Sequence, residues 1–360
     1  MIEIHVNLGP RSYPILVGAG ALSMVGAQLA KRGVGRRVVL VSDPTIARLH
    51  GDSVLRSLSS AGFDVAQIGV PEGEQAKRLE IASNLWDRLL ELGCDRTSTV
   101  VALGGGAVGD LAGFAAATYM RGMNFVQVPT TLLAQVDAAI GGKTAIDHPQ
   151  GKNLIGAFHQ PRMVVVDPSA LKTLPEREFR SGLAEVIKHG IVLDAAYFRE
   201  LESSVPALLA RDLATLDWVV AGSCRLKARV VERDEQEAEL RWVLNYGHTI
   251  GHALEAATGF QRWVHGEAVS LGIVAEARLA ECLGVGSLST TERQIRLLSA
   301  VGLPVKGLAV DPGAVIEALS RDKKRRDGRV SFVLAPEIGA FRIVPDVPPD
   351  SVRQVLEELF

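Results

Sequence analysis

A run of β-branched and apolar residues that ends in three consecutive glycines constrains this fold more than any other feature. Residues 99–103 predict a buried strand, and Gly104, Gly105 and Gly106 follow it directly. Similar runs at residues 37–41, 125–128 and 163–166 predict three more strands, and residues 79–92 have apolar residues at helical spacing. Strands that alternate with helices are typical of a parallel sheet with crossover helices. The first half of the chain therefore predicts a Rossmann-like α/β domain.

Helical periodicity replaces the strand-like runs after about residue 174. The expected helices, separated by Gly or Pro, cover residues 176–192, 205–232, 243–257, 266–283, 290–301, 312–320 and 351–360, with a strand-like stretch at 329–334. A chain of 360 residues exceeds what one hydrophobic core usually serves. We expect a nucleotide-binding α/β domain at residues 1–174 and a mainly helical metal- and substrate-binding domain at residues 175–360.

Charge and cysteine content narrow the functional class. The formal net charge is only −2, which argues against a nucleic-acid partner. Glycines and Asp110 interrupt the longest apolar tract, residues 100–120, so no membrane span is expected, and the first twenty residues lack a signal-peptide pattern. Cys94, Cys224 and Cys282 are too few and too scattered for a disulfide framework. These features predict a cytoplasmic protein that acts on small molecules.

The glycine run suggests a phosphate site. Glycines between a strand and a helix let backbone N–H groups approach a pyrophosphate, and the helix N-terminus adds positive potential. Asp110, just inside the following helix, favours a functional role because an acid placed there needs a partner. The spacing differs from the common GxGxxG pattern, so a tight turn that binds nothing is the alternative.

Polar residues at helical spacing predict a second site. Glu185 and Lys188 lie three apart on a predicted helix and share a face, although an isolated pair of this kind is usually a solvated ion pair. Four polar residues farther along the chain, Arg241, Asn245, His248 and His252, are spaced by four, three and four positions and share one face of an otherwise apolar predicted helix. Four such side chains are costly to bury without partners, so we expect them to face a ligand.

Histidines in this region are candidate metal ligands. His248 and His252 have the spacing of an HxxxH pair, and His265 begins the following predicted helix. With Glu185 they suit a divalent cation, but spacing alone leaves open which two of the three histidines bind it. A metal beside a dinucleotide indicates chemistry on a hydroxyl-bearing carbon. Basic residues suited to an anionic substrate are Arg121, Lys143, Lys152, Lys227 and the run 323–326, which by itself would be a solvated loop.

Longer segments of the chain resemble the 3-dehydroquinate synthase family. The matching motifs occur in order across nearly the whole chain, at residues 104–114, 119–122, 128–137, 141–144, 151–153, 182–188, 244–253, 265–267 and 322–324. The resemblance implies a metal, usually zinc with Co²⁺ as an alternative, held by Glu185, His248 and His265. His252 would then handle substrate or a proton and would not be a ligand.

The resemblance also assigns cofactor and substrate contacts. NAD would lie on Asp43, Glu74, Lys77, Gly105, Gly106, Asp110, Thr130 and Thr131, with Lys143 and Lys152 nearby. Substrate would meet Arg121, Asp137, Lys143, Asn153, Lys188, Lys227, Arg241, Asn245, His252 and one of Lys323 or Lys324. The residues expected to take part in catalysis are Lys143, Lys152, Asn153, Glu237 and His252.

The implied reaction belongs to the shikimate pathway of aromatic amino acid biosynthesis. It converts 3-deoxy-D-arabino-heptulosonate 7-phosphate to 3-dehydroquinate and phosphate. The steps are transient oxidation with NAD, loss of phosphate, reduction, ring opening and an internal aldol closure. The resemblance further implies a homodimer in which Arg121 reaches the neighbouring subunit's substrate.

Related activities remain as alternatives. Another sugar phosphate cyclase would share the fold, NAD and metal, but its substrate lacks the carboxylate that the set Arg241, Asn245, His252 and Lys323–Lys324 suits. An aminodehydroquinate synthase is a closer variant. A metal-dependent polyol dehydrogenase has a similar architecture but needs fewer anion-binding side chains. A non-catalytic binding protein is disfavoured because the expected reactive residues are present.

Overall fold

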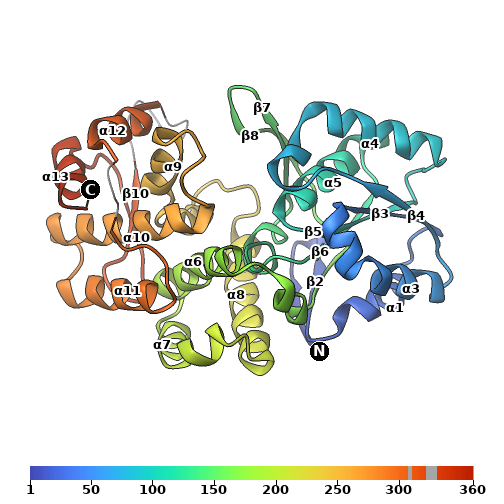
Figure 1. The fold of residues 1–360 in the computed structure, drawn as a ribbon, viewed down its shortest axis with the longest axis horizontal. Coiled ribbons are helices and arrows are strands. Elements are labelled where there is room, and N and C mark those ends of the chain that lie inside the picture. The colour runs from blue at the N-terminus through green and yellow to red at the C-terminus, as the bar shows by residue number, and fades with distance from the viewer. Residues whose placement is uncertain (307–309, 322–330, 360) are drawn as a thin grey trace. The chain divides into compact units, whose positions relative to one another are not determined.

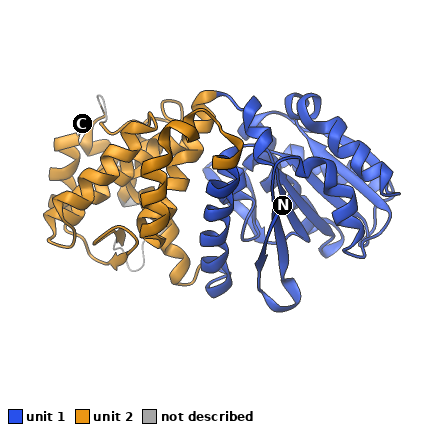
Figure 2. Ribbon diagram, turned by 90° about the horizontal axis from the view of Figure 1, so that it is seen from below, with its two compact units in different colours: residues 1–175, 216–236 blue, residues 176–215, 237–360 orange. Residues whose placement is uncertain are grey.

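The computed structural model describes residues 1–306, 310–321 and 331–359 and divides the chain into two compact units. The first unit comprises residues 1–175 and 216–236, and the second comprises residues 176–215 and 237–360 (Figure 2). Within the described residues, no helix is long and apolar enough to cross a membrane. The three cysteines are unpaired.

A seven-stranded sheet forms the centre of the first unit, in the order β1-β2-β9-β6-β5-β3-β4 (Figure 1). Its strands are β1 (Ile2–Val6), β2 (Tyr13–Val17), β3 (Arg37–Ser42), β4 (Asp64–Gly69), β5 (Thr99–Gly104), β6 (Asn124–Pro129) and β9 (Met163–Val166). β1 pairs antiparallel with β2, and the other neighbouring strands are parallel. The four strands expected from sequence are confirmed as β3, β5, β6 and β9. The others were not expected.

Both faces of this sheet are apolar and covered by helices. Because successive strand residues point to opposite faces, Val38 and Leu40 pack on one side while Val39 and Val41 pack on the other. The first side meets α1 (Val25–Ala30) and α3 (Asp52–Ser60), and the second meets α4 (Leu79–Glu91) and α5 (Gly106–Thr118). A separate hairpin consists of β7 (Lys143–His148) and β8 (Gly151–Phe158). The predicted α/β class is confirmed.

The second unit is mainly helical, as expected. Its longer helices are α6 (Glu176–Leu193), α7 (Ala195–Leu209), α9 (His248–Ala257), α10 (His265–Cys282), α11 (Leu288–Ala300), α12 (Pro312–Arg321) and α13 (Pro349–Leu359), beside a small hairpin of β10 (Phe332–Leu334) and β11 (Arg342–Val344). One apolar core joins α9, α10, α12, α13 and β10, with Leu254, Leu279 and Val315 among its buried members. This packing holds the helices that carry the histidines.

The helix expected at residues 205–232 is in fact two helices. α7 ends at Leu209, and α8 (Leu213–Arg233) begins after a turn in which Arg211 has a φ of 54°. Asp212 starts α8, because its carboxylate accepts hydrogen bonds from the backbone N–H and the hydroxyl of Thr215. Residues 216–236 belong to the first unit, so the division of the chain differs here from the expected boundary at residue 174.

Long-range polar contacts explain why α8 packs with the first unit. The thiol of Cys224 donates to the backbone carbonyl of Gln135, and Glu232 accepts hydrogen bonds from the backbone and side chain of Asn7. Such contacts between distant residues leave no trace in helical periodicity. The sequence pattern therefore did not indicate which core this helix would join.

Candidate active site

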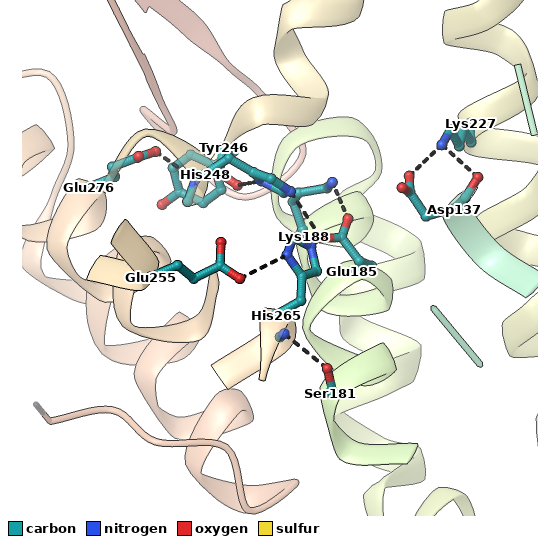
Figure 3. Close-up of polar contacts among 12 residues, drawn as sticks. Asp137, Ser181, Glu185, Lys188, Lys227, Tyr246, His248, Glu255, His265 and Glu276 are labelled. Atoms are coloured by element: carbon teal, nitrogen blue, oxygen red, sulfur yellow. Dashed lines mark hydrogen bonds and ion pairs between the residues drawn. The ribbon is translucent and has the colours of Figure 1, made fainter. Parts of the chain in front are cut away.

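Three side chains from separate helices of the second unit converge in Figure 3. Glu185 comes from α6, whereas His248 and His265 are the first residues of α9 and α10. Oε1 of Glu185 lies 3.3 Å from Nε2 of each histidine, and Oε2 accepts a hydrogen bond from Lys188. One oxygen of the carboxylate thus faces both imidazoles, and the other is held by the ammonium group. The three ligand atoms lie within 4.8 Å of one another, as a shared cation requires.

Electrostatics keep the carboxylate of this cluster ionised. Burial of Glu185 opposes its ionisation, but the nearby Lys188 and His248 outweigh burial and hold its pKa well below the ordinary value. Burial and the charge of Lys188 lower the pKa of His248, which favours a neutral imidazole. Burial also lowers the pKa of His265, but Glu185 and Glu255 together raise it to about 10. The carboxylate is therefore ionised at neutral pH.

Close packing between α6 and α10 places His265 beside Glu185. The backbone N–H of Gly266 donates to the Ser181 hydroxyl over 2.9 Å, one helical turn before Glu185 (Figure 3). A Cβ on Gly266 would lie 1.9 Å from the carbonyl oxygen of Ser181, so only glycine permits this approach. Arg177 adds an ion pair with Glu267 at 2.7 Å. The residues around His265 thus fix its backbone against α6.

The expected polar stripe does not lie on one continuous helix. Arg241 and Asn245 belong to a 3₁₀ helix (Leu240–Asn245), while His248 and His252 belong to α9. The break is at Gly247, which has a φ of 77°, and a Cβ there would lie 2.6 Å from Cγ1 of Ile273 on α10. The prediction of a single helix over residues 243–257 was therefore wrong, because contact with α10 requires a left-handed residue at that point.

The remaining polar residues of this region lie close to the break. Asn245 donates to Oε1 of Glu237 at 3.5 Å, and Arg241 is buried. His252 lies one turn after His248, with ring centroids 5.2 Å apart, and forms a second grouping with Glu255 and His265. The structure thus places His252 next to the Glu185 cluster but outside it. Lys323 and Lys324 lie outside the described residues.

A second polar cluster lies in the first unit around Lys77. Its ammonium donates to Oδ2 of Asp110 at 2.7 Å and to the side-chain oxygen of Asn153, and lies 4.0 Å from both Glu74 and Asp147. Lys152 is 3.6 Å from Glu74. The structure therefore brings together cofactor candidates and catalytic candidates that are far apart in the sequence.

Carboxylates dominate the electrostatics of the Lys77 cluster. Burial raises the pKa of Asp110 and of Glu74, although Lys77 acts against both shifts. Burial lowers the pKa of Lys77, but Asp110, Glu74 and Asp147 outweigh it, so its net shift is upward. The shifts of the two acids, caused mainly by burial, and that of Lys77, caused by its three carboxylate neighbours, all favour the protonated forms. The cluster is therefore a site that retains protons.

The glycine turn provides close backbone access. β5 ends at Gly104, and α5 begins at Gly106. A Cβ on Gly105 would lie 3.1 Å from Cγ2 of Thr131, so a side chain would narrow this turn. Thr130 lies alongside, with its N–H donating to the Gly104 carbonyl at 2.9 Å. Its hydroxyl is buried and has no hydrogen-bond partner among the described residues.

Other predicted site residues of the first unit occupy separate positions. Lys227 on α8 donates to Oδ1 of Asp137 at 2.6 Å and to its backbone carbonyl at 2.7 Å. Asp43 caps a short helix by accepting a hydrogen bond from the N–H of Ile46. Lys143 is exposed at the start of β7, and Arg121 is exposed in a turn after α5.

Two acidic residues near the clusters were missed by the sequence analysis. Asp147 carried no signal, because it belongs to a hairpin that was not expected. Glu255 did carry a signal in the sequence, because it follows His248 by seven residues and therefore lies on the same helix face. Its Oε1 lies 3.9 Å from Nδ1 of His265.

Family models match most of the chain. Residues 67–181 match the 3-dehydroquinate synthase N-terminal model, and residues 182–325 match the 3-dehydroquinate synthase C-terminal model. A 3-dehydroquinate synthase from Nostoc punctiforme is 51% identical over 98% of each chain. Another from Pelotomaculum thermopropionicum is 52% identical over 94% of this chain and 92% of the relative.

Solved structures show the same architecture. A 2-deoxy-scyllo-inosose synthase complexed with carbaglucose-6-phosphate, NAD⁺ and Co²⁺ is 25% identical, with a TM-score of 0.91 over 100% of both chains. A 2-epi-5-epi-valiolone synthase from Streptomyces hygroscopicus with NAD⁺ and Zn²⁺ bound is 28% identical, with a TM-score of 0.88 over 96% of each chain. A probable glycerol dehydrogenase from Sinorhizobium meliloti, 19% identical with a TM-score of 0.66, shares the fold alone. The chain therefore belongs to the 3-dehydroquinate synthase family.

Proposed function

We propose that this protein converts 3-deoxy-D-arabino-heptulosonate 7-phosphate to 3-dehydroquinate and phosphate. Family membership supports the reaction, since curated relatives about half identical to the chain carry this name. The structural observation that carries the proposal is the position of Glu185 Oε1, which is 3.3 Å from Nε2 of both His248 and His265. A carboxylate and two imidazoles suit a cation that binds substrate oxygens.

The donor set fits Zn²⁺ or Co²⁺. One carboxylate oxygen and two imidazole nitrogens leave coordination positions for substrate hydroxyls, as in catalytic zinc sites. We assign the ligand roles to Glu185, His248 and His265. When bound, the metal would act as a Lewis acid on a hydroxyl-bearing carbon. Lys188 holds the other oxygen of Glu185 and so keeps the carboxylate oriented.

The first unit fits NAD. The glycine turn gives a pyrophosphate access to the N-terminus of α5, and the buried Thr130 hydroxyl has an unused hydrogen-bonding capacity among the described residues. NAD would supply reversible hydride acceptance. Glu74, Lys77 and Asp110 would contact it from the Lys77 cluster. Asp43, which follows the end of β3, and Thr131, beside Gly105, would be further contacts.

Basic and polar side chains would bind the substrate and move its protons. Several polar residues lie within a few positions of a metal ligand along the chain and supply donors for a carboxylate and hydroxyls: Lys188, Arg241, Asn245 and His252. We assign Nδ1 or Nε2 of His252 a proton-transfer role, because the ring lies beside His248. Lys143, Lys152 and Asn153 would serve phosphate and proton transfer, with Asp137, Lys227 and Glu237 as further polar contacts. This set favours a carboxylated substrate over the sugar phosphates of related cyclases.

We further propose a homodimer in which Arg121 reaches the partner's substrate. Arg121 is exposed, and it and Met120 both have positive φ, 66° and 49°. Contacts from two other residues hold this unfavourable turn, with Arg96 donating to the Met120 carbonyl at 2.9 Å and Tyr119 donating to the Cys94 carbonyl at 3.0 Å. Strained backbone that the fold supports in this way is typical of functional positions.

A cytoplasmic location accords with the unpaired cysteines.

The decisive experiment follows phosphate and NADH together. We expect turnover of the heptulosonate phosphate with catalytic NAD and Zn²⁺ to release phosphate without accumulating NADH, because the hydride returns to the same molecule. A parallel reaction with sedoheptulose 7-phosphate, which lacks the carboxylate, should be far slower. NADH formed in proportion to substrate consumed would refute the proposal, and so would a preference for the uncarboxylated sugar.

A further inference from the structure

Glu276 is a buried acid on the apolar helix α10, at a point where it meets the start of α9. Its side chain is completely buried, and its Oε2 accepts a hydrogen bond from the backbone N–H of Gly247 at 2.6 Å (Figure 3). Its Oε1 lies 3.4 Å from the N–H of Ile250 and accepts from it. A carboxylate this deeply buried has a large desolvation cost, so a specific role is expected for it.

The two contacts make Glu276 the N-cap of a helix to which it does not belong. The first N–H groups of a helix have no partner within that helix, and a side chain of the N-cap residue usually accepts from one of them. The N-cap residue of α9 is Gly247, which has no side chain. It has to be glycine, because its φ is 77° and a Cβ would lie 2.9 Å from the carbonyl oxygen of Val269. Glu276 supplies the missing acceptor from α10.

Close contact also fixes the position of the cap along α10. Gly272 lies one turn before Glu276, and a Cβ there would be 1.9 Å from the carbonyl oxygen of Gly247. The neighbouring Tyr246 is held from another direction, because its hydroxyl donates to Oε1 of Gln294 on α11 at 2.7 Å. The Tyr246–Gly247 turn is thus bound by two helices and has little freedom to move.

This turn determines the orientation of His248. The Tyr246 carbonyl lies 3.1 Å from Nδ1 of His248, so Nδ1 carries the proton and Nε2 faces Glu185. Metal-binding histidines commonly donate their second ring N–H to a carbonyl or carboxylate, which fixes the ring and its tautomer. Because His265 begins the same helix that carries Glu276, the cap also sets the position of one histidine relative to the other.

We propose that Glu276 is a positioning residue for the metal centre, which holds the Tyr246–Gly247 turn and through it the imidazole of His248. The inference rests on the proposed metal site of Glu185, His248 and His265. Metal affinity and coordination geometry should therefore depend on a residue that does not touch the metal. The effect is expected in the range of about 10- to 100-fold in affinity, the usual cost of losing a supporting contact.

The test compares four chelator-stripped proteins titrated with Co²⁺ and Zn²⁺. They are wild type, Glu276→Gln, the ligand variant His248→Ala, and Leu279→Ala, which removes apolar packing from the buried core of the same helix. The readouts are metal affinity by competition with a chromophoric chelator, the visible absorption of bound Co²⁺, and thermal stability of the metal-free proteins. Glu276→Asp serves as a second variant that keeps the charge but shortens the reach.

We expect Glu276→Gln to weaken Co²⁺ and Zn²⁺ binding about 10- to 100-fold and to alter the Co²⁺ spectrum. Leu279→Ala should lower the melting temperature without changing either metal readout. If Glu276→Gln and Glu276→Asp melt lower but bind metal within twofold of wild type, Glu276 is only a structural cap and the inference fails. If His248→Ala also binds as wild type does, the proposed metal site itself is wrong.

Discussion

The two polar clusters contain a buried and a half-buried carboxylate whose pKa values shift in opposite directions. Glu185 lies among Lys188, His248 and His265, and its pKa is well below the ordinary value despite complete burial. Asp110 shares one close ammonium with two other acids, and burial raises its pKa. Burial alone therefore does not decide the ionisation of a buried acid; the balance of neighbouring charges does.

The difference corresponds to the ligands that we propose for each cluster. An ionised carboxylate with neutral imidazole nitrogens nearby can bind a cation, provided that His265 gives up its proton. A cluster with more acids than ammonium groups retains protons and can exchange them with a bound cofactor or substrate. The predictions below change the charge balance of one cluster, or its contacts, while the other remains as a reference.

The largest effect is expected at the proposed metal cluster. Glu185→Gln removes the ionised oxygen that faces both histidines, so bound zinc should be lost and activity should fall at least about 100-fold, beyond the cost of losing an outer contact. His252→Ala, the matched control on α9, should keep most of the metal while losing rate. Metal analysis of both purified variants checks this, and equal zinc loss in the two would contradict the ligand assignment.

A second prediction compares the two lysines by folding stability alone. Lys77→Met leaves Asp110, Glu74 and Asp147 without their central ammonium, and the loss should be about 3–5 kcal/mol at pH 7. Lys188→Met should cost less, because two histidines still face Glu185. Urea unfolding of the metal-free proteins measures both losses.

The pH dependence of the stability loss in Lys77→Met tests whether the uncompensated acids cause it. Lys77 lowers the pKa of Asp110, so its removal should raise that pKa further above the unfolded value. A group with a raised folded pKa destabilises the protein above that pKa and ceases to do so as the pH falls through it. The destabilisation should therefore shrink between pH 7 and pH 4. A loss that is constant or grows toward acid would show that the acids are not the cause.

The third prediction asks whether one chain completes its own site. A bidentate charged contact to phosphate contributes roughly 1.5–3 kcal/mol, so Arg121→Ala should weaken substrate binding about 10- to 100-fold and leave NAD binding nearly unchanged. Mixing Arg121→Ala with an inactive Lys152→Ala protein should restore activity, because each heterodimer would contain one intact site. If mass spectrometry confirms subunit exchange and no activity returns, Arg121 acts within its own chain.

The smallest effect is expected at Thr130. Its buried hydroxyl has no partner among the described residues, so Thr130→Val should leave the melting temperature of the free protein unchanged or slightly raised. If NAD forms a hydrogen bond with that hydroxyl, Thr130→Val should weaken the free energy of NAD binding by about 0.5–1.5 kcal/mol, the usual net contribution of one hydrogen bond. Calorimetric NAD titration provides the measurement. A stability loss with unchanged NAD affinity would mean that the hydroxyl serves the fold.

Local patterns were sufficient for much of the fold. The run 99–103 before the glycines formed β5, and the helical spacing around Glu185 formed α6, because strand and helix periods depend on neighbours in the chain. The edge strand β4 was not anticipated, because it is only partly buried and has no clear apolar face. The hairpin of β7 and β8, much of it exposed, lacks such a signal as well.

The sequence by itself determined which residue types were available for a cation and a phosphate, and the family resemblance indicated their roles. Only the tertiary structure decided the grouping. Helical spacing favoured His248 with His252, yet Glu185 faces His248 and His265, because Gly266 allows α10 to approach Ser181 of α6. Spacing fixes distances within one helix, whereas distances between helices depend on packing between residues that are remote in the chain. The break at Gly247 has the same cause, since only its contact with α10 requires a left-handed residue there.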